Sequence, residues 1–202
     1  MKQIIRLTLI ILVSTGCSQP KPVKTIENLK AAIIGETNAS ARYEAFAAKA
    51  HEEGFETIAR LFEATSKAEA IHSANHTRVL AAYGENIGTI RPEFEVKTTV
   101  ENLRVAIDGE TYEANTMYPL FITDAVAEKA EEAQKTFIWA EDTEKKHKQF
   151  CTVALEALAA NTDDSLSREY ALCPVCGNTF GRTAVDDNCS FCQTSNEEFI
   201  HL

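Results

Sequence analysis

Two single glutamates and two Glu-x-x-His motifs are the residues of this sequence best suited to bind metal ions. They are Glu36, Glu69-x-x-His72, Glu110 and Glu144-x-x-His147. Side chains three residues apart share one face of an α-helix, so each motif would present a carboxylate and an imidazole together. One Glu from each of two helices and Glu-x-x-His from two others form the ligand set of di-iron and di-manganese bundles. The spacing therefore predicts a two-metal site, although any one of these glutamates alone would indicate only a solvated helix face.

A second group of metal-binding residues lies near the C-terminus. Two Cys-x-x-Cys knuckles, Cys173 to Cys176 and Cys189 to Cys192, are separated by twelve residues. Four thiolates at this spacing predict a tetrahedral site that takes zinc or iron. A zinc ribbon is the purely structural alternative, and disulfide pairing is a further one in an exported chain. We expect a small domain over 170–202, with Tyr170, Phe180, Phe191 and Phe199 as its core, after a polar linker at 161–169.

An internal repeat predicts the elements that must position the glutamates and histidines. Residues 27–37 and 101–111 are identical at eight of eleven positions, at an offset of 74. The two Glu-x-x-His motifs correspond at an offset of 75. The body of the chain, residues 25–160, is therefore two copies of one unit.

Each copy has the apolar periodicity of a helical hairpin. We expect helices over 25–51 and 55–83 in the first copy, and over 98–127 and 128–160 in the second, with a crossing loop at 84–97. Glu36 and Glu69 lie at equal distances from the first turn, and Glu110 and Glu144 at equal distances from the second. The sequence therefore predicts a mainly α protein whose four-helix bundle brings the six groups to one depth, where metal ions compensate the buried carboxylates.

Glu113 breaks the symmetry of the repeat. It lies three residues after Glu110 and so shares its helix face, whereas its counterpart in the first copy is Ala39. A seventh ligand on one side suggests that one metal ion can change partners. The alternative is an exposed helix glutamate. We expect His51, His76 and His201 to be surface residues, because they lie outside the paired motifs.

The N-terminus has the layout of an export signal. Basic Lys2 and Arg6 precede an apolar run, and small residues precede Cys17. We expect residues 1–17 to be a signal segment resembling that of bacterial lipoproteins, with Cys17 as lipid anchor, and 18–24 to be a tether. The protein would then be a membrane-anchored lipoprotein of the cell envelope, or cytoplasmic if the segment is not a functional signal. The net charge of −10 argues against a nucleic-acid partner.

Taken together, these motifs resemble rubrerythrin over residues 25–202. The resemblance rests on Gly35-Glu36, Glu69-x-x-His72, Gly109-Glu110-x-x-Glu113, Met117-Tyr118-Pro119, Glu144-x-x-His147 and the two knuckles. It implies a ferritin-like di-iron bundle joined to a rubredoxin-like four-cysteine iron domain. By that likeness Glu36, Glu69, Glu110 and Glu144 supply carboxylates and His147 binds one iron. Glu113 and His72 would be alternative ligands of the other iron.

The activity implied by the resemblance is reduction of hydrogen peroxide to water in oxidative stress protection. Electrons would come through the cysteine iron from an external donor, a reductase or a rubredoxin. Tyr43 and Tyr118 match tyrosines near the family's di-iron site and would donate hydrogen bonds there. A homodimer or higher oligomer is implied as well, with the module of one subunit serving the bundle of another. The competing functions are a ferroxidase or iron-storage protein, and a non-enzymatic zinc-ribbon protein.

Overall fold

The computed structural model describes residues 21–181 and 185–202. The expected signal segment, Cys17 and the first three residues of the expected tether, 18–20, lie outside these residues. No helix within the described ranges is long and apolar enough to cross a membrane.

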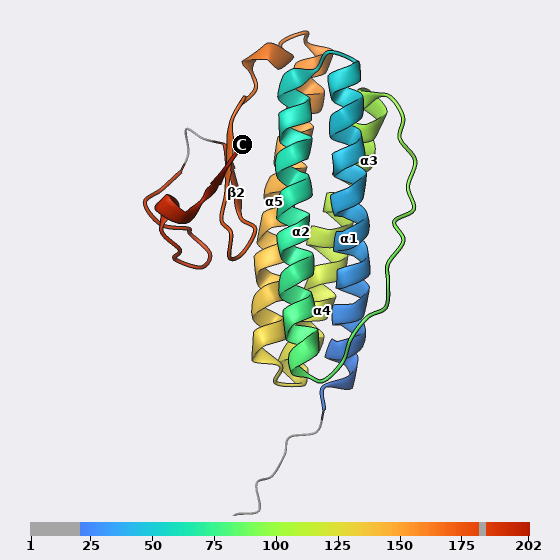
Figure 1. Ribbon diagram of the computed structural model, residues 1–202, viewed down its shortest axis with the longest axis vertical. Helices are drawn as coiled ribbons and strands as arrows, with labels where there is room; N and C mark the ends of the chain where they lie inside the picture. The colour runs from blue at the N-terminus through green and yellow to red at the C-terminus, as the bar shows by residue number, and fades with distance from the viewer. Residues whose placement is uncertain (1–20, 182–184) are drawn as a thin grey trace, which may run out of the picture.

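The first hairpin consists of α1 (Val23–Glu52) and α2 (Glu56–Ala82), which pack side by side along their whole length (Figure 1). Gly54 makes the turn with a positive φ of 85°, a conformation that glycine adopts without steric cost. Both helices begin and end within two residues of the predicted bounds, because their apolar spacing is regular and the turn residue is a glycine.

The second hairpin consists of α3 (Thr99–Tyr112), a π-helical segment η1 (Glu113–Met117), α4 (Tyr118–Ala127) and α5 (Glu131–Ala159). Thr98 and Glu101 form a reciprocal capping box that fixes the start of α3. The turn before α5 has Lys129 at a φ of 56° in place of a glycine. The prediction of one continuous helix over 98–127 missed the π segment.

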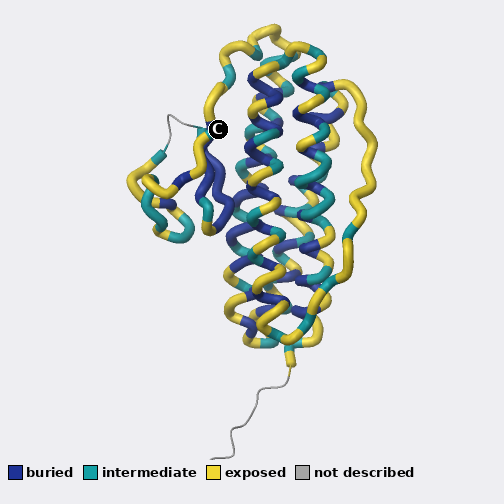
Figure 2. The backbone as a smooth tube through the Cα atoms, in the orientation of Figure 1, coloured by how far each residue is buried: buried dark blue, intermediate teal, exposed yellow. Residues whose placement is uncertain are grey.

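The two hairpins are joined by an extended, mostly exposed segment that runs the length of the bundle beside α1 (Figures 1 and 2). This crossing connection agrees with the predicted loop and makes the second hairpin start at the end of the bundle where α1 and α2 turn. The four helical arms therefore form a ferritin-like bundle with one long crossover.

Two apolar clusters fill the bundle, one on each side of a polar layer. One cluster contains Tyr43, Phe46, Phe62 and Leu103. The other contains Leu29, Ile33, Leu80, Tyr118 and Phe137. The candidate metal ligands fall between these two sets along each helix, so apolar packing closes the site at both ends.

The cysteine-bearing module follows a short 3₁₀ turn, η2 (Asp163–Ser165), and lies against α2 and α5 (Figure 1). Its sheet is antiparallel in the order β2-β1-β3, formed by β1 (Tyr170–Leu172), β2 (Thr179–Gly181) and β3 (Ile200–His201), with a 3₁₀ turn η4 (Asn196–Glu198) before the last strand. Burial within the module is concentrated in β1, in β2 and in the cysteine loop between them (Figure 2).

The module has a smaller aromatic core than predicted. Phe180 stacks on Phe199 with ring centroids 5.4 Å apart, and Phe191 packs against the same cluster. Tyr170 instead belongs to the apolar cluster of the bundle, where its ring lies 5.9 Å from that of Phe150. Its assignment to the module core was wrong, because β1 lies directly against the helices and its first residue packs into them.

Candidate metal centres

Six predicted metal-binding groups meet in the middle of the bundle. Glu36 comes from α1, Glu69 and His72 from α2, Glu110 from α3, and Glu144 and His147 from α5. Each is at most 1% exposed. Ionised groups are buried at this density only where opposite charge compensates them, so the arrangement is that of a cation site.

The six groups divide into two overlapping sets, each compact enough to hold one metal ion. Glu36, Glu69, His72 and Glu144 form one set, and Glu69, Glu110, Glu144 and His147 form the other. In each set the ligand atoms lie within 4.8 Å of one another. Glu69 and Glu144 belong to both sets, which is the position of carboxylates that bridge two ions. The donor set thus fits a carboxylate-bridged pair with one imidazole on each ion.

Both imidazoles turn the same ring nitrogen toward the bridging carboxylates. His147 Nδ1 lies 2.9 Å from Glu144 Oε2 and 3.1 Å from Glu69 Oε1. His72 Nδ1 lies 3.0 Å from Glu69 Oε2 and 3.1 Å from Glu144 Oε1. The Nε2 atoms therefore point out of the site.

Proton affinities in the metal-free site reflect its excess of carboxylates. Burial, together with Glu69 and Glu144, raises the pKa of Glu36 to about 8. Burial lowers the pKa of His147, but the attraction of Glu69 and Glu144 outweighs it and raises the value to about 9. The two histidines in turn hold the pKa of Glu69 below its usual range against the effect of burial. With no metal ion bound, protons on Glu36 and His147 offset part of the negative charge of the carboxylates.

Two buried tyrosines connect the hairpins crosswise. The Tyr43 hydroxyl on α1 donates to Glu110 of the second hairpin, and the Tyr118 hydroxyl on α4 donates to Glu36 of the first. Burial, followed by the negative charge of the bonded glutamates, raises the pKa of both phenols well above the ordinary value. Both therefore stay neutral hydrogen-bond donors, as the predicted role requires.

The π segment accounts for the change of repeat offset. Glu36 and Glu110 are 74 residues apart, whereas Tyr43 and Tyr118 are 75 apart, as are the helix ends Glu52 and Ala127. The second copy thus carries one extra residue between its glutamate and its tyrosine, where η1 lies. A π turn absorbs a single insertion within a helix.

Glu113 is the first residue of that π segment and belongs to neither four-residue set. Its Oε1 nevertheless lies 3.9 Å from the position that a Cβ on Gly35 would occupy, directly before Glu36. Burial, together with Glu36 and Glu144, raises its pKa well above the ordinary value. The structure brings His72 into the first set and leaves Glu113 beside it.

His76 was predicted to be a surface residue, and that prediction was wrong. The side chain is fully buried one turn beyond His72, with Nε2 3.3 Å from the Tyr118 hydroxyl and Nδ1 3.1 Å from Thr136 Oγ1. Burial, reinforced by His72, lowers its pKa to about 3 and keeps the ring neutral. A signal was present in the sequence, because His72 and His76 are four residues apart on one helix face. His51 is half-buried between Glu56 and Glu63, and His201 is exposed.

The four cysteines of the module also converge. Their Sγ atoms all lie within 4.8 Å of one another, with Cys173 and Cys192 3.3 Å apart and Cys176 and Cys189 3.5 Å apart. These separations exceed a disulfide bond by more than 1 Å. The geometry is therefore that of a tetrathiolate metal site, and the disulfide alternative does not describe it.

The module contacts the outer sides of both histidines of its own chain. The expected contact of one subunit's module with the bundle of another stays a prediction, because the structure is that of a single chain. Thr179 Oγ1 lies 3.0 Å from His147 Nε2, and Asn75 beyond His72 donates to the Val175 carbonyl at 2.8 Å. A Cβ on Gly177 would come within 2.5 Å of His72 Nε2, so only glycine permits this approach. The sequence identified neither Thr179 nor Gly177, since both make their contact across the domain junction.

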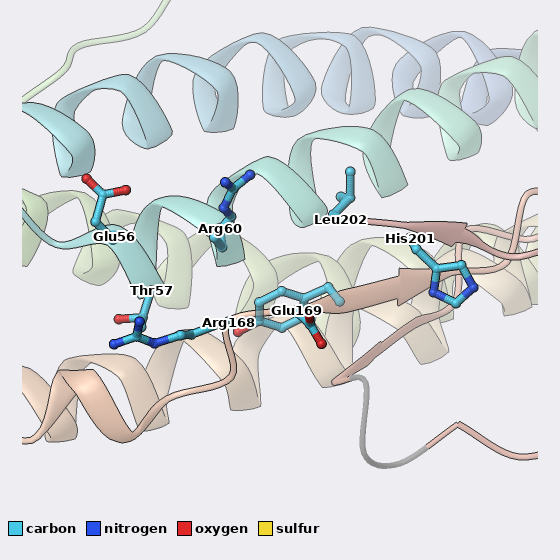
Figure 3. A pocket seen from close by; sticks show the side chains of 8 residues that line it. Glu56, Thr57, Arg60, Arg168, Glu169, His201 and Leu202 are labelled. Atoms are coloured by element: carbon cyan, nitrogen blue, oxygen red, sulfur yellow. The ribbon is translucent and has the colours of Figure 1, made fainter.

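A surface cleft of about 600 Å³ lies away from both centres (Figure 3). It is bounded by the start of α2, the end of the linker and the C-terminal strand, with Arg60, Arg168 and His201 among its lining residues. None of the candidate ligands lines it. This cleft therefore forms no part of the two candidate metal centres.

A carboxylate-bridged two-metal bundle with an appended tetrathiolate module defines the class of the protein. Comparison with known proteins then shows the family, because the Rubrerythrin family model matches residues 27–155. The chain belongs to the rubrerythrin family.

Relatives and solved structures agree with this assignment. Nigerythrin of Nitratidesulfovibrio vulgaris is 40% identical over 161 residues, which cover 76% of this chain and 74% of that protein. Rubrerythrin-2 of Clostridium acetobutylicum is 32% identical over 89% of this chain and 97% of its own length. The fully reduced, all-ferrous structure of nigerythrin superimposes with a TM-score of 0.78 at 32% identity and covers all of both chains.

The family assignment identifies the cofactors. They are a carboxylate-bridged di-iron site in the bundle and an iron in the rubredoxin-like four-cysteine site, and both donor sets are present in this chain. The protein is an oxidoreductase of the di-iron type with a role in oxidative stress. An archaeal ferritin from Archaeoglobus fulgidus shares the fold alone, at 14% identity and a TM-score of 0.58.

Proposed function

We propose that this protein is a peroxidase that reduces hydrogen peroxide to water at the di-iron site. The observation that carries the proposal is the position of the tetrathiolate module, which directly contacts the outer faces of both histidines. A storage protein has no need of an electron carrier at this place, whereas a peroxidase must be re-reduced after every turnover.

We assign the di-iron ligands to the two overlapping sets, with Glu69 and Glu144 as bridges and Glu113 as the alternative to His72. When bound, the iron pair supplies the two electrons that peroxide reduction requires, and the cysteine iron passes replacements singly from an external donor, a reductase or a rubredoxin. Four carboxylates balance the charge of two divalent ions, so a fifth at Glu113 suits a more highly charged state of the site.

The other residues of the layer prepare the site. Tyr43 and Tyr118 hold Glu110 and Glu36 through neutral hydroxyls, which keeps one oxygen of each carboxylate engaged. His76 lies behind Tyr118 and orients its hydroxyl. The two apolar clusters exclude water above and below, so charge interactions within the layer are strong.

The test is anaerobic stopped-flow oxidation of the fully reduced, iron-loaded protein by hydrogen peroxide or by oxygen. We expect peroxide to oxidise both kinds of iron much faster than oxygen does. Cys189→Ser should abolish repeated turnover with an external reductant, whereas Ser190→Ala keeps all four thiols and should turn over normally. Preference for oxygen, with uptake of added ferrous iron as mineral, would replace the peroxidase by an iron-storage function.

We propose further that the chain is exported, lipidated at Cys17 and assembled as a homo-oligomer. The basis for export is the sequence pattern of residues 1–17. Fractionation of cells that produce the full chain should find it in the membrane fraction, and Cys17→Ala should release it. Recovery of both proteins from the cytosol would refute export. Sedimentation of the purified protein measures the oligomer.

A further inference from the structure

The outer nitrogen of His147 makes a hydrogen bond that no pattern in the sequence predicts. His147 Nε2 lies 3.0 Å from Thr179 Oγ1, and both side chains are completely buried. Thr179 is the first residue of β2 in the module, and His147 lies on α5 of the bundle. The bond therefore joins a candidate iron ligand directly to the electron-carrying module.

The hydroxyl of Thr179 is placed to favour a proton on Nε2 of His147. A hydroxyl has one proton to give, and Thr179 donates it to the Gly177 carbonyl at 3.2 Å. Its lone pairs are then free to accept from His147 Nε2–H, which is the tautomer that a metal ion on Nδ1 requires. When a metal ion takes the place of the proton on Nδ1, the lone pair of Nδ1 is directed at the site between Glu69 and Glu144.

His72 lacks this support. Its Nε2 is buried against Gly177 and has no hydrogen-bond partner among the described residues. The two histidines are related by the internal repeat and present the same nitrogen to the same two carboxylates. They differ in the group behind them, since one faces a hydroxyl and the other a glycine.

We propose that Thr179 is a positioning residue that makes His147 the fixed imidazole ligand of the di-iron site, while His72 stays free to exchange. The proposal rests on the ligand assignment given under Proposed function but not on peroxidase activity. An outer hydrogen bond to a ligand histidine fixes its tautomer and ring orientation, and its loss weakens metal binding. The threonine reaches the bundle only through the docked module, so docking and ligand geometry are coupled.

The experiment uses cobalt(II) as a probe of both centres in the full protein. Cobalt in four thiolates gives intense charge-transfer absorption, whereas cobalt bound to oxygen and nitrogen gives weak ligand-field bands, so the two sites titrate separately. Thr179→Val keeps the shape of the side chain without the hydroxyl, and Thr179→Ser keeps the hydroxyl. Thr57→Val is the matched control, because Thr57 is a buried threonine that donates to the Asp163 carbonyl far from the ligands.

We expect Thr179→Val to weaken cobalt binding in the bundle roughly ten-fold while the thiolate site titrates normally. Thr179→Ser should restore the affinity, and Thr57→Val should bind as the unaltered protein does. In the zinc-loaded protein, the Nε2 proton resonance of His147 should shift upfield and exchange faster in Thr179→Val alone. Unchanged cobalt affinity in Thr179→Val would overturn the proposal. So would equal weakening in Thr179→Ser, since packing rather than the hydroxyl would then be responsible.

Discussion

Gly177 shows at the scale of one residue how the two centres come together. Its backbone has a φ of 82°, and a Cβ there would lie 2.5 Å from His72 Nε2 and 3.2 Å from the Ala68 carbonyl. The glycine thus serves two purposes, the left-handed turn after the knuckle and the close approach to the bundle. Gly54 has almost the same φ, of 85°, but open space around it. A comparison of Gly54 with Gly177 therefore distinguishes the effect of backbone strain from the effect of a close contact.

Gly177→Ala should therefore cost more than Gly54→Ala. Both place alanine at positive φ, at a cost of about 1–2 kcal/mol, but only Gly177→Ala also pushes the module away from His72. We expect Gly54→Ala to lower only the free energy of unfolding. Gly177→Ala should lower the free energy of unfolding and also slow electron transfer between the centres. The measurements are urea unfolding and single-turnover kinetics monitored at the thiolate iron. Equal behaviour of the two variants would mean that the module does not sit this close to His72.

At the scale of the element, the π segment η1 is where the second hairpin departs from the first. In the first hairpin Ala39 occupies the position of Glu113 and is buried in the apolar cluster. The extra residue of the second hairpin widens the helix at that point. We infer that the wider turn provides the room for a carboxylate that a regular helix would not accommodate.

Removal of Asn115, an exposed residue within η1, tests this inference. The deletion should restore a regular helix and force Glu113 into the space that alanine fills in the first hairpin. We expect a marked loss of stability, which Glu113→Ala in the same chain should largely reverse. The coupling between the two changes, measured by urea unfolding, should be about 1–3 kcal/mol. Additive effects would show that the π segment and Glu113 are independent.

At the scale of the whole molecule, the bundle encloses a layer whose charge depends on what occupies it. Without metal, protons are bound by Glu36 and His147, with pKa values of about 8 and about 9. Both values lie above the ordinary values of 4.5 and 6.5, so the folded chain binds more protons than the unfolded chain at neutral pH. The stability that these protons confer is lost as the pH rises. The lowered pKa of Glu69 affects stability only below about pH 4.5, the ordinary pKa of a glutamate, and so has no influence at neutral or alkaline pH.

The metal-free protein should therefore unfold at a progressively lower temperature between pH 7 and pH 9. Calorimetry at fixed ionic strength measures the effect. Glu36→Gln should flatten part of the slope, because an amide does not titrate. In the iron-loaded protein the cations replace the protons, so we expect its unfolding temperature to hold or rise over the same range. A metal-free protein that gains stability toward pH 9 would contradict this account.

The sequence alone predicted the two helical hairpins, the crossing connection and the sets of Glu, His and Cys that converge. These features follow from periodicity and spacing within single helices and knuckles. Within a regular helix, the spacing of two residues fixes whether they share a face and how far along the bundle they lie. The internal repeat also indicated that the two hairpins are copies of one unit that pack together. Even the change of offset from 74 to 75 was visible, although its meaning as a π turn was not.

Only the tertiary structure decided the contacts between elements distant in the chain. It buried His76 behind Tyr118, moved Tyr170 from the module into the bundle core, and crossed the two tyrosines between hairpins. It also set Thr179 and Gly177 against the two histidines. Such contacts have no periodic signature, because they depend on how two separately formed surfaces fit. The physical reason is that a helix face is determined by residues three or four apart, whereas a docked interface is determined by the shape of both partners.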